Sequence, residues 1–247
     1  MVDRNAILAF INTRKNVTIY DLCESFNISE STARRTISYL EEKGKIGRYH
    51  GGAFSLLQNP KTQIISRLDE NTDKKIRIAQ SASEIVCDNS TIILLGGTTV
   101  SYMCTFIKKK RITVITNSML VLDELKNCPN IKLIILGGLY NNDESEVGGI
   151  LSNSSLSYLR ADLLFMGASG FDEKSGFINA NHSVELFRTC VKASNETNVL
   201  VDSSKYNSGG SSIAASPEQI KRLYTNSDLD PRIIKSFQLK GVEVILS

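Results

Sequence analysis

The sequence predicts an α/β protein in which a small, mainly helical domain precedes a larger domain built on a mostly parallel sheet. Between Asp3 and Gly44, apolar residues recur at helical spacing. From Arg67 onward, short apolar runs recur instead, and helix-like segments flank each of them. The chain has 247 residues and is 41% hydrophobic, which suffices for two domains of ordinary soluble composition.

The first two helices are predicted by apolar spacing and by capping residues. A helix is expected over residues 3–14, where Ile7, Leu8 and Ile11 share one side. Thr18 is expected to cap the next helix, with Asp21 accepting hydrogen bonds from the first turn.

A third helix is expected over residues 30–43, after a tight turn. Asn27 tolerates the left-handed conformation that such a turn needs, Ser29 is an N-cap residue, and Gly44 ends the helix. Three short helices with a tight turn between the second and the third form a helix-turn-helix pattern.

The third helix has one aliphatic face and one polar face. At about 100° per residue, Ala33, Ile37 and Leu40 fall on a narrow apolar stripe. The opposite face carries short hydroxyls and arginine, with Arg34 on the flank and Thr32 near the start. Arginine can donate two hydrogen bonds to a guanine edge, and short side chains allow close approach to a major groove. A solvated surface helix with some charge is the alternative interpretation.

Positive charge is concentrated around this helix. Between Ser31 and His50, five basic side chains outnumber two acidic ones, so this segment alone accounts for the net charge of +3. Such a local excess indicates an anionic partner.

The segment KIGRYHGGAF, which follows Gly44, predicts a β-hairpin, or wing. A wing beside a reading helix contacts backbone phosphate or the minor groove. His50 is alternatively a structural hydrogen-bonding group. The predicted DNA-binding residues are Ser29, Ser31, Thr32, Arg34, Arg35, Ser38, Arg48, Tyr49 and His50.

We expect three segments along the chain. Residues 1–56 form the winged helix-turn-helix domain, and residues 57–72, which contain Pro60 and lack periodicity, form a linker. Residues 73–247 form the effector domain, which opens with a helix over residues 73–86. Its strands are expected at residues 91–95, 112–116, 131–136, 161–166, 198–201 and 242–246.

Small and polar residues follow these strands, at the sheet edge where ligands bind in open α/β sheets. The Gly96–Thr99 turn before a helix offers N–H groups and a positive dipole end that suit phosphate, and Lys205 adds a charge. Any one glycine-rich turn is alternatively only a sharp turn, and Lys205 a surface lysine. The predicted effector-binding residues are Gly96, Gly97, Thr98, Thr99, Asn117, Ser118, Gly137, Gly138, Gly167, Ser169, Gly170, Asp172 and Lys205.

Several classes of protein are disfavoured. The chain has neither a GxxxxGK[ST] nor a GxGxxG motif, which argues against those types of nucleotide site. Its five cysteines are scattered without a CxxC pair, so we expect neither a disulfide framework nor a metal site. We expect no membrane segment and no signal peptide in MVDRNAILAF, and therefore a cytoplasmic protein.

The motifs together resemble the DeoR family of transcriptional regulators. ISESTARRTISYLEEKGKIGRYHGGA is similar to that family's winged helix-turn-helix. Its sensor domain is matched by GGTT, ITVITNS, LGGLYNNDES, ADLLFMGASGFDEKSG and VDSSKY. The chain departs from the family at Leu95 and Asn226, where an aspartate is usual, and at Thr36 in the reading helix.

The resemblance implies a repressor of sugar-catabolic genes with a sensor domain similar in fold to ribose-5-phosphate isomerase. It implies a double-stranded DNA operator, a phosphorylated sugar as effector, no cofactor, and a homodimer or homotetramer. Two alternatives remain open. One is a sugar-phosphate isomerase-like enzyme, for which Asp172, Glu185 and Asp202 are the carboxylates near the sheet edge. The other is a sensor that acts through protein partners.

Overall fold

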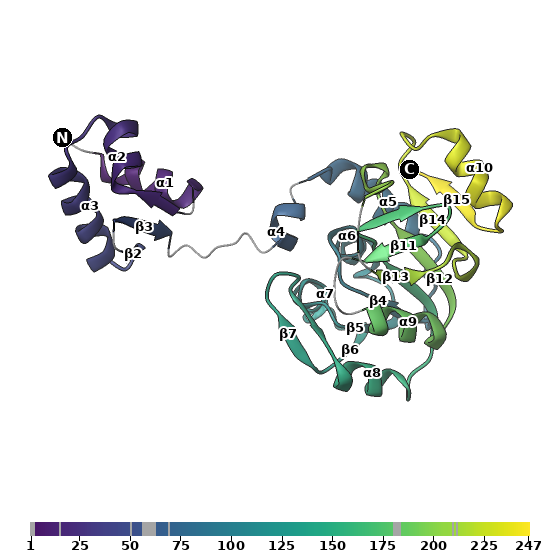
Figure 1. Ribbon diagram of the computed structural model, residues 1–247. Coiled ribbons are helices and arrows are strands. Elements are labelled where there is room, and N and C mark those ends of the chain that lie inside the picture. Colours follow the sequence, from purple (N-terminus) through teal and green to yellow (C-terminus); the bar gives the residue numbers. More distant parts are fainter. Residues whose placement is uncertain are drawn as a thin grey trace. The chain divides into compact units, whose positions relative to one another are not determined.

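The computed structural model describes residues 3–14, 16–49, 51–55, 63–68, 70–179, 184–208, 210 and 212–247. The chain divides into two compact units, residues 1–61 and residues 62–247 (Figure 1).

The first unit consists of three helices and a small antiparallel sheet in the order β1-β3-β2. The hairpin of β2 and β3 confirms the predicted wing, whereas β1 was not predicted. The elements are α1 (Arg4–Arg14), β1 (Asn16–Thr18), α2 (Ile19–Phe26), α3 (Glu30–Glu42), β2 (Ile46–Tyr49) and β3 (Gly52–Ser55).

Local side-chain contacts fix the ends of these helices where the sequence predicts them. The Thr18 hydroxyl accepts a hydrogen bond from the Asp21 N–H (3.1 Å), and the Asp21 carboxylate accepts one from the Thr18 N–H (2.7 Å). Asn27 adopts the left-handed conformation (φ 48°) after α2. The Ser29 hydroxyl accepts from the Thr32 N–H at the start of α3 (3.3 Å).

The second unit is built on a seven-stranded sheet in which every neighbouring pair is parallel, in the order β15-β14-β12-β9-β4-β5-β6. This confirms the predicted α/β class. The strands are β4 (Thr91–Leu94), β5 (Ile112–Thr116), β6 (Ile131–Ile135), β9 (Ala161–Met166), β12 (Ser194–Leu200), β14 (Arg222–Thr225) and β15 (Glu243–Leu246).

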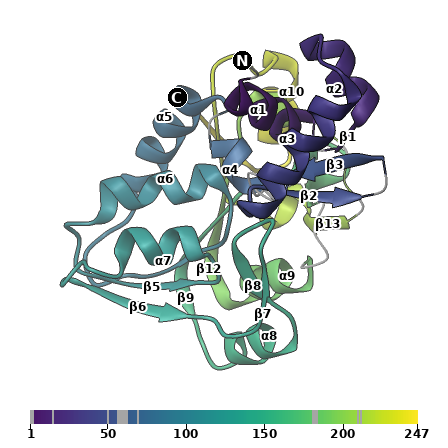
Figure 2. The same cartoon turned by 90° about the vertical axis from the view of Figure 1, so that its left-hand side faces the viewer.

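Helices cover both faces of this sheet (Figure 2). One face packs against α5 (Thr72–Ser83), α6 (Thr98–Ile107) and α7 (Met119–Leu125). The other face packs against α8 (Ile150–Leu156), α9 (Val184–Ala193) and α10 (Pro231–Leu239). The alternation of strand side chains explains the two cores, because Ile93 of β4 enters one core while Ile92 and Leu94 enter the other.

Smaller elements lie outside the seven-stranded sheet. β7 (Leu139–Asn141) and β8 (Glu146–Gly148) form a hairpin, and β10 (Gly170–Asp172), β11 (Gly176–Asn179) and β13 (Ser212–Ala215) form an antiparallel sheet. Single 3-10 turns span Ser203–Lys205 and Pro217–Gln219. None of these was predicted. The expected linker of residues 57–72 contains a helix, α4 (Gln63–Leu68), and α5 begins at its last residue.

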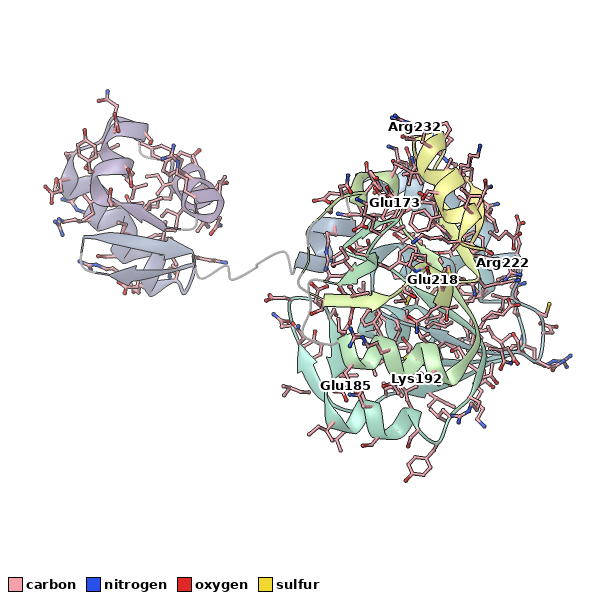
Figure 3. The ribbon with its side chains drawn as sticks, turned by 45° about the vertical axis from the view of Figure 1, so that its right-hand side comes forward. Glu173, Glu185, Lys192, Glu218, Arg222 and Arg232 are labelled. Carbon is pink, nitrogen blue, oxygen red and sulfur yellow. The ribbon has the colours of Figure 1, made fainter. Side chains whose placement is uncertain are left out.

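At the opposite, amino edge of the sheet, Arg222 connects three strands. It begins β14, and its guanidinium contacts Glu196 of β12 (2.6 Å) and Glu243 of β15 (3.0 Å). Figure 3 labels Arg222 near the ends of these strands. Arg222 is therefore engaged in holding these strands together.

Candidate functional site

The α3 helix presents the polar face that its sequence predicts. Ala33 and Ile37 are buried beneath it, whereas Ser31, Arg35 and Ser38 are exposed. The outer face is therefore accessible to a duplex groove, as the angular positions of these residues require.

Arg34 and the hydroxyls at the start of α3 have partners within the helix. The Arg34 Nη2 contacts the Glu30 carboxylate, one turn earlier, at 2.5 Å. The Ser29 hydroxyl lies 3.0 Å from that of Ser31 and 2.9 Å from that of Thr32. If these groups bound a duplex, they would exchange these contacts for contacts to DNA. The free-energy cost would be small, because exposed contacts of this kind are individually weak.

One arginine of the wing contacts the polar face of α3. Arg48 Nη1 donates to the Ser38 hydroxyl (3.3 Å) and lies 3.9 Å from the Glu41 carboxylate. The backbone of Tyr49 is in β2, but its side chain lies outside the described part of the chain, as does all of His50.

A groove between α1 and α3 adds basic residues that sequence reasoning did not assign to DNA binding. Arg4, Lys43 and Lys45 line it together with Arg35 and Tyr39. The Arg4 guanidinium lies 4.0 Å from the centre of the Tyr39 ring, a cation–π contact that fixes its position. Only the charge of the RRTISYLEEKGK segment signalled this cluster in advance.

In the second unit, a pocket lies where the strand order reverses. Strands β5 and β6 follow β4 on one side, whereas β9 and β12 lie on its other side. Such a reversal opens a crevice at the carboxyl ends of the central strands. The pocket is lined by Arg67, Lys75, Gly96, Gly97, Thr98, Thr99, Glu144, Glu146, Gly167, Ala168, Ser169, Asn179, Phe187, Leu200, Val201, Asp202 and Lys205.

One wall of the pocket is the glycine turn between β4 and α6. Gly97 has a φ of 124°, which favours glycine, and no side chain caps the helix there. Thr98 and Thr99 form the first turn of α6, whose leading N–H groups have no partner within the helix. Gly167, which follows β9, lies beside this turn, at ordinary van der Waals distance (4.0 Å) from the place of a Cβ on Gly97. This wall suits an anion.

Two lysines add positive charge to the pocket. Lys75 of α5 is only 3% exposed, and its Nζ donates to the backbone carbonyl of Arg67. Burial lowers the pKa of Lys75, although the nearby Asp202 opposes that change. Lys205 is half-buried on the turn after β12. The sequence singled out Lys205 and missed Lys75, whose position in a charged helical run resembles that of a surface lysine.

The β7–β8 hairpin brings two buried carboxylates to the pocket, Glu144 and Glu146. Burial, reinforced by the charge of Glu144, raises the pKa of Glu146 to about 7. Asn117 links this hairpin to the glycine turn, because its Nδ2 donates to Glu146 (3.2 Å) and its Oδ1 accepts from the Gly96 N–H (3.1 Å). Neither carboxylate was predicted, and only the acidic tract in NNDESE hinted at them.

The structure brings some of the predicted effector residues together and not others. Gly96, Gly97, Thr98, Thr99, Gly167, Ser169 and Lys205 line the pocket. Asn117 supports it from behind, whereas Ser118, Gly137, Gly138, Gly170 and Asp172 are not among the lining residues.

The predicted residues outside the pocket have local structural contacts. Gly138 and Gly170 both lie against backbone. A Cβ on Gly138 would stand 2.3 Å from the Gly148 carbonyl oxygen, and a Cβ on Gly170 would stand 1.9 Å from the Ser208 carbonyl oxygen. The Asp172 carboxylate accepts from the N–H groups of Lys174 (2.8 Å) and Ser175 (2.6 Å), so it caps a turn.

The departures from the family pattern also have structural roles. Leu95 is fully buried in the core that contains α9, and Thr36 is buried beneath α3. The Asn226 side chain accepts from the Ser203 N–H (2.7 Å) and donates to the Ser203 hydroxyl (3.0 Å). Asn226 thus holds the turn that carries Lys205.

Other expected features concern metals, thiols and membranes. The five cysteines are free. Within the described ranges, no group of three or more metal-ligating side chains comes together. No helix there has the length and apolar character needed to cross a membrane.

Comparison with known proteins identifies both units. Residues 4–59 match the model of the DeoR-like helix-turn-helix domain, and residues 70–227 match that of the DeoR C-terminal sensor domain. An uncharacterized HTH-type transcriptional regulator, YulB of Bacillus subtilis, is 33% identical over 96% of this chain and 93% of its own. The regulator GolR of Listeria innocua is 32% identical over 98% of this chain and 96% of its own. The L-fucose operon activator of Haemophilus influenzae is 28% identical over 97% of both chains.

Among solved structures, ribose 5-phosphate isomerase A from Methanocaldococcus jannaschii is similar over 56% of this chain and 55% of that chain. The identity is 21% and the TM-score 0.42. This likeness is partial, and no property of that enzyme is carried over. Both matched family models instead describe parts of regulators, and with a 33% identical relative over nearly the full length they show that the chain belongs to the DeoR family of transcriptional regulators.

Proposed function

We propose that this regulator is a cytoplasmic repressor of sugar-catabolic genes, which binds a double-stranded DNA operator and is controlled by a phosphorylated sugar in the pocket of its second unit. The observation that carries the proposal is the pocket at the strand-order reversal. There the uncapped turn at Gly97 and the lysines Lys75 and Lys205 surround one space. A phosphate group has the charge and the acceptor oxygens that such a wall binds.

The polar lining supports a sugar as the remainder of the ligand. The carboxylates of Glu144 and Glu146 and the amide of Asn179 can bind hydroxyl groups. The name of the Haemophilus influenzae relative, an L-fucose operon activator, also connects a similar chain with a sugar operon. Because that relative is named an activator, repression in particular is a proposal about this chain.

On the DNA side, the proposal assigns base contacts to the outer face of α3 and backbone contacts to the wing. Arg35 and Ser38 are exposed on that face, and Arg48 lies beside it. We further propose a homodimer or homotetramer, because a two-fold assembly presents two reading helices to a palindromic operator.

The proposed control is thermodynamic linkage. If the phosphorylated sugar binds one arrangement of the chain better than another, it shifts the population that binds the operator, and the operator shifts ligand affinity equally.

Isothermal titration calorimetry on the full chain tests the pocket. Phosphorylated sugars are expected to bind, their unphosphorylated parents are not, and Lys75→Met together with Lys205→Met is expected to abolish binding. Equal binding of the parent sugars, or unchanged binding by the double variant, would refute the assignment of the phosphate wall.

The alternative of a sugar-phosphate isomerase-like enzyme is not favoured, because both matched family models and the similar relatives are described as parts of transcriptional regulators. Of the three carboxylates that the sequence offered as a base for isomerisation, Asp172 and Glu185 are not among the pocket-lining residues. Asp172 caps a turn outside the pocket, and Asp202 accepts hydrogen bonds from the Ser204 N–H (3.1 Å), the Ser204 hydroxyl and the Asn71 amide (3.3 Å).

A further inference from the structure

We propose that Arg67 is a ligand-binding residue of the pocket, which exchanges Glu144 for the ligand's phosphate and so transmits pocket occupancy to α4. This inference rests on the proposed function, because it names the element through which the same pocket would signal. The position of α4 in the chain is the reason why a change there could reach the DNA-binding unit. It is the first helix of the second unit, directly after the segment that leads from the DNA-binding unit.

Two pocket-lining side chains hold α4 through Arg67. The Arg67 guanidinium forms an ion pair with Glu144 of the β7–β8 hairpin. The backbone carbonyl of the same residue accepts a hydrogen bond from the buried Lys75. Residue 67 is therefore held at both its side chain and its backbone by groups that line the pocket.

Two further contacts of the described part of α4 lead to the same structural elements. The Ile64 N–H donates to the carbonyl of Asp143, next to Glu144, at 3.1 Å. The Leu68 carbonyl accepts from the Tyr102 hydroxyl of α6 at 3.1 Å. The β7–β8 hairpin and α6 thus both hold α4 in place. A displacement of either element would therefore displace α4.

Charge explains why a ligand would break the ion pair. The pocket lining holds the cations Arg67, Lys75 and Lys205 and the carboxyl groups of Glu144, Glu146 and Asp202, and Glu144 already pairs with Arg67. An entering phosphate carries up to two negative charges and cannot be accommodated beside Glu144 without repulsion. It also offers a guanidinium two acceptor oxygens, the geometry that arginine binds best.

The exchange has a defined structural result. When Arg67 turns to the phosphate, the hairpin loses its ion pair to α4, and Lys75 is drawn from the Arg67 carbonyl towards the same anion. The ion pair to Glu144 and the hydrogen bond from Lys75 are then replaced by contacts to the ligand, and α4 is held differently.

Hydrogen exchange on the full chain, with inorganic phosphate as the probe and chloride at equal ionic strength as the reference, tests this inference. Phosphate is expected to speed exchange of the α4 amides, including that of Ile64. Glu144→Gln is expected to speed it without phosphate and to raise phosphate affinity roughly tenfold, because it removes one buried competing carboxylate. Glu124→Gln is the control, because Glu124 forms an exposed ion pair with Lys108 (2.7 Å) away from the pocket lining.

Arg67→Gln is expected to weaken phosphate binding and to remove its effect on α4, whereas Arg67→Lys is expected to retain part of both. The matched control is Arg232→Gln, since Arg232 pairs with Asp230 on the exposed surface of α10 (Figure 3). Unchanged phosphate affinity in Arg67→Gln, or phosphate binding without any change at α4, would overturn the inference and leave the pocket assignment intact. No phosphate binding by the parent chain would overturn both.

Discussion

The carboxylate of Glu146 lies directly against Gly96, so that a Cβ at position 96 would stand 1.8 Å from the Glu146 Oε1. A side chain at position 96 would therefore require the buried Glu146 side chain to move. Asn117 completes this contact by hydrogen bonding to both partners.

Gly96→Ala should destabilise the second unit by about 1–3 kcal/mol, because a buried side chain must move to admit the methyl group. Urea denaturation measures the effect. Gly137→Ala is the control, since a Cβ at position 137 meets no atom within 4 Å. Equal stability of the two variants would show that Glu146 is not confined as described.

Glu146 should make the free energy of unfolding depend on pH. Its pKa is raised to about 7 in the folded chain and is about 4.3 in an unfolded one, so the folded state holds the proton more tightly. Its contribution is present below pH 4 and is lost as pH rises through 7, by on the order of 4 kcal/mol at most.

The comparison of unfolding at pH 5 and pH 8 isolates this residue. Glu146→Gln should lose less stability between the two pH values than the parent chain, because glutamine does not ionise. Glu124→Gln, at an exposed position, should behave like the parent. An identical pH dependence in all three chains would mean that Glu146 titrates normally.

Arg35→Ala should weaken operator binding by about 1–3 kcal/mol and relax the preference for one base, if Arg35 contacts a guanine edge. Fluorescence anisotropy with operator and scrambled duplexes measures both effects, with Arg232→Ala as the control for lost charge. Equal losses on every duplex, accompanied by a smaller salt dependence, would instead make Arg35 a phosphate contact.

Thr18→Ala should destabilise α2 by about 1 kcal/mol, because the N–H of Asp21 loses the hydroxyl that accepts from it. Hydrogen exchange of the α2 amides reports the change. Thr13→Ala in α1 is the control, because the Thr13 hydroxyl only donates to the Ala9 carbonyl within its own helix. If both variants exchange alike, the capping box does not hold the helix start.

Features specified by neighbouring residues could be predicted from the sequence. The cap formed by Thr18 and Asp21, the left-handed Asn27 and the apolar run of β4 depend on residues close in the chain. The strand β14 escaped prediction because it begins with Arg222, whose charge is neutralised by residues of other strands, and ends with the polar Thr225.

The pocket could be predicted only in part, because some of its residues are close in the chain to predicted strands and others are not. Its glycine turns directly follow predicted strands, so Gly97 and Gly167 were found. Lys75 and Glu146 become pocket residues through packing between distant segments, and their sequence surroundings look like those of exposed charges. Gly138 and Gly170 are in turns of the same kind, but there the glycine allows another backbone segment to approach closely.

The most direct test of the whole account is one titration. The full chain is bound to a labelled duplex from the region upstream of its own gene, and anisotropy is followed while phosphorylated sugars or their unphosphorylated parents are added. The account predicts that at least one phosphorylated sugar changes DNA affinity while its parent does not, and that the Lys75→Met, Lys205→Met chain binds DNA without responding. DNA binding that no phosphorylated sugar alters, or that the parent sugar alters equally, would contradict it.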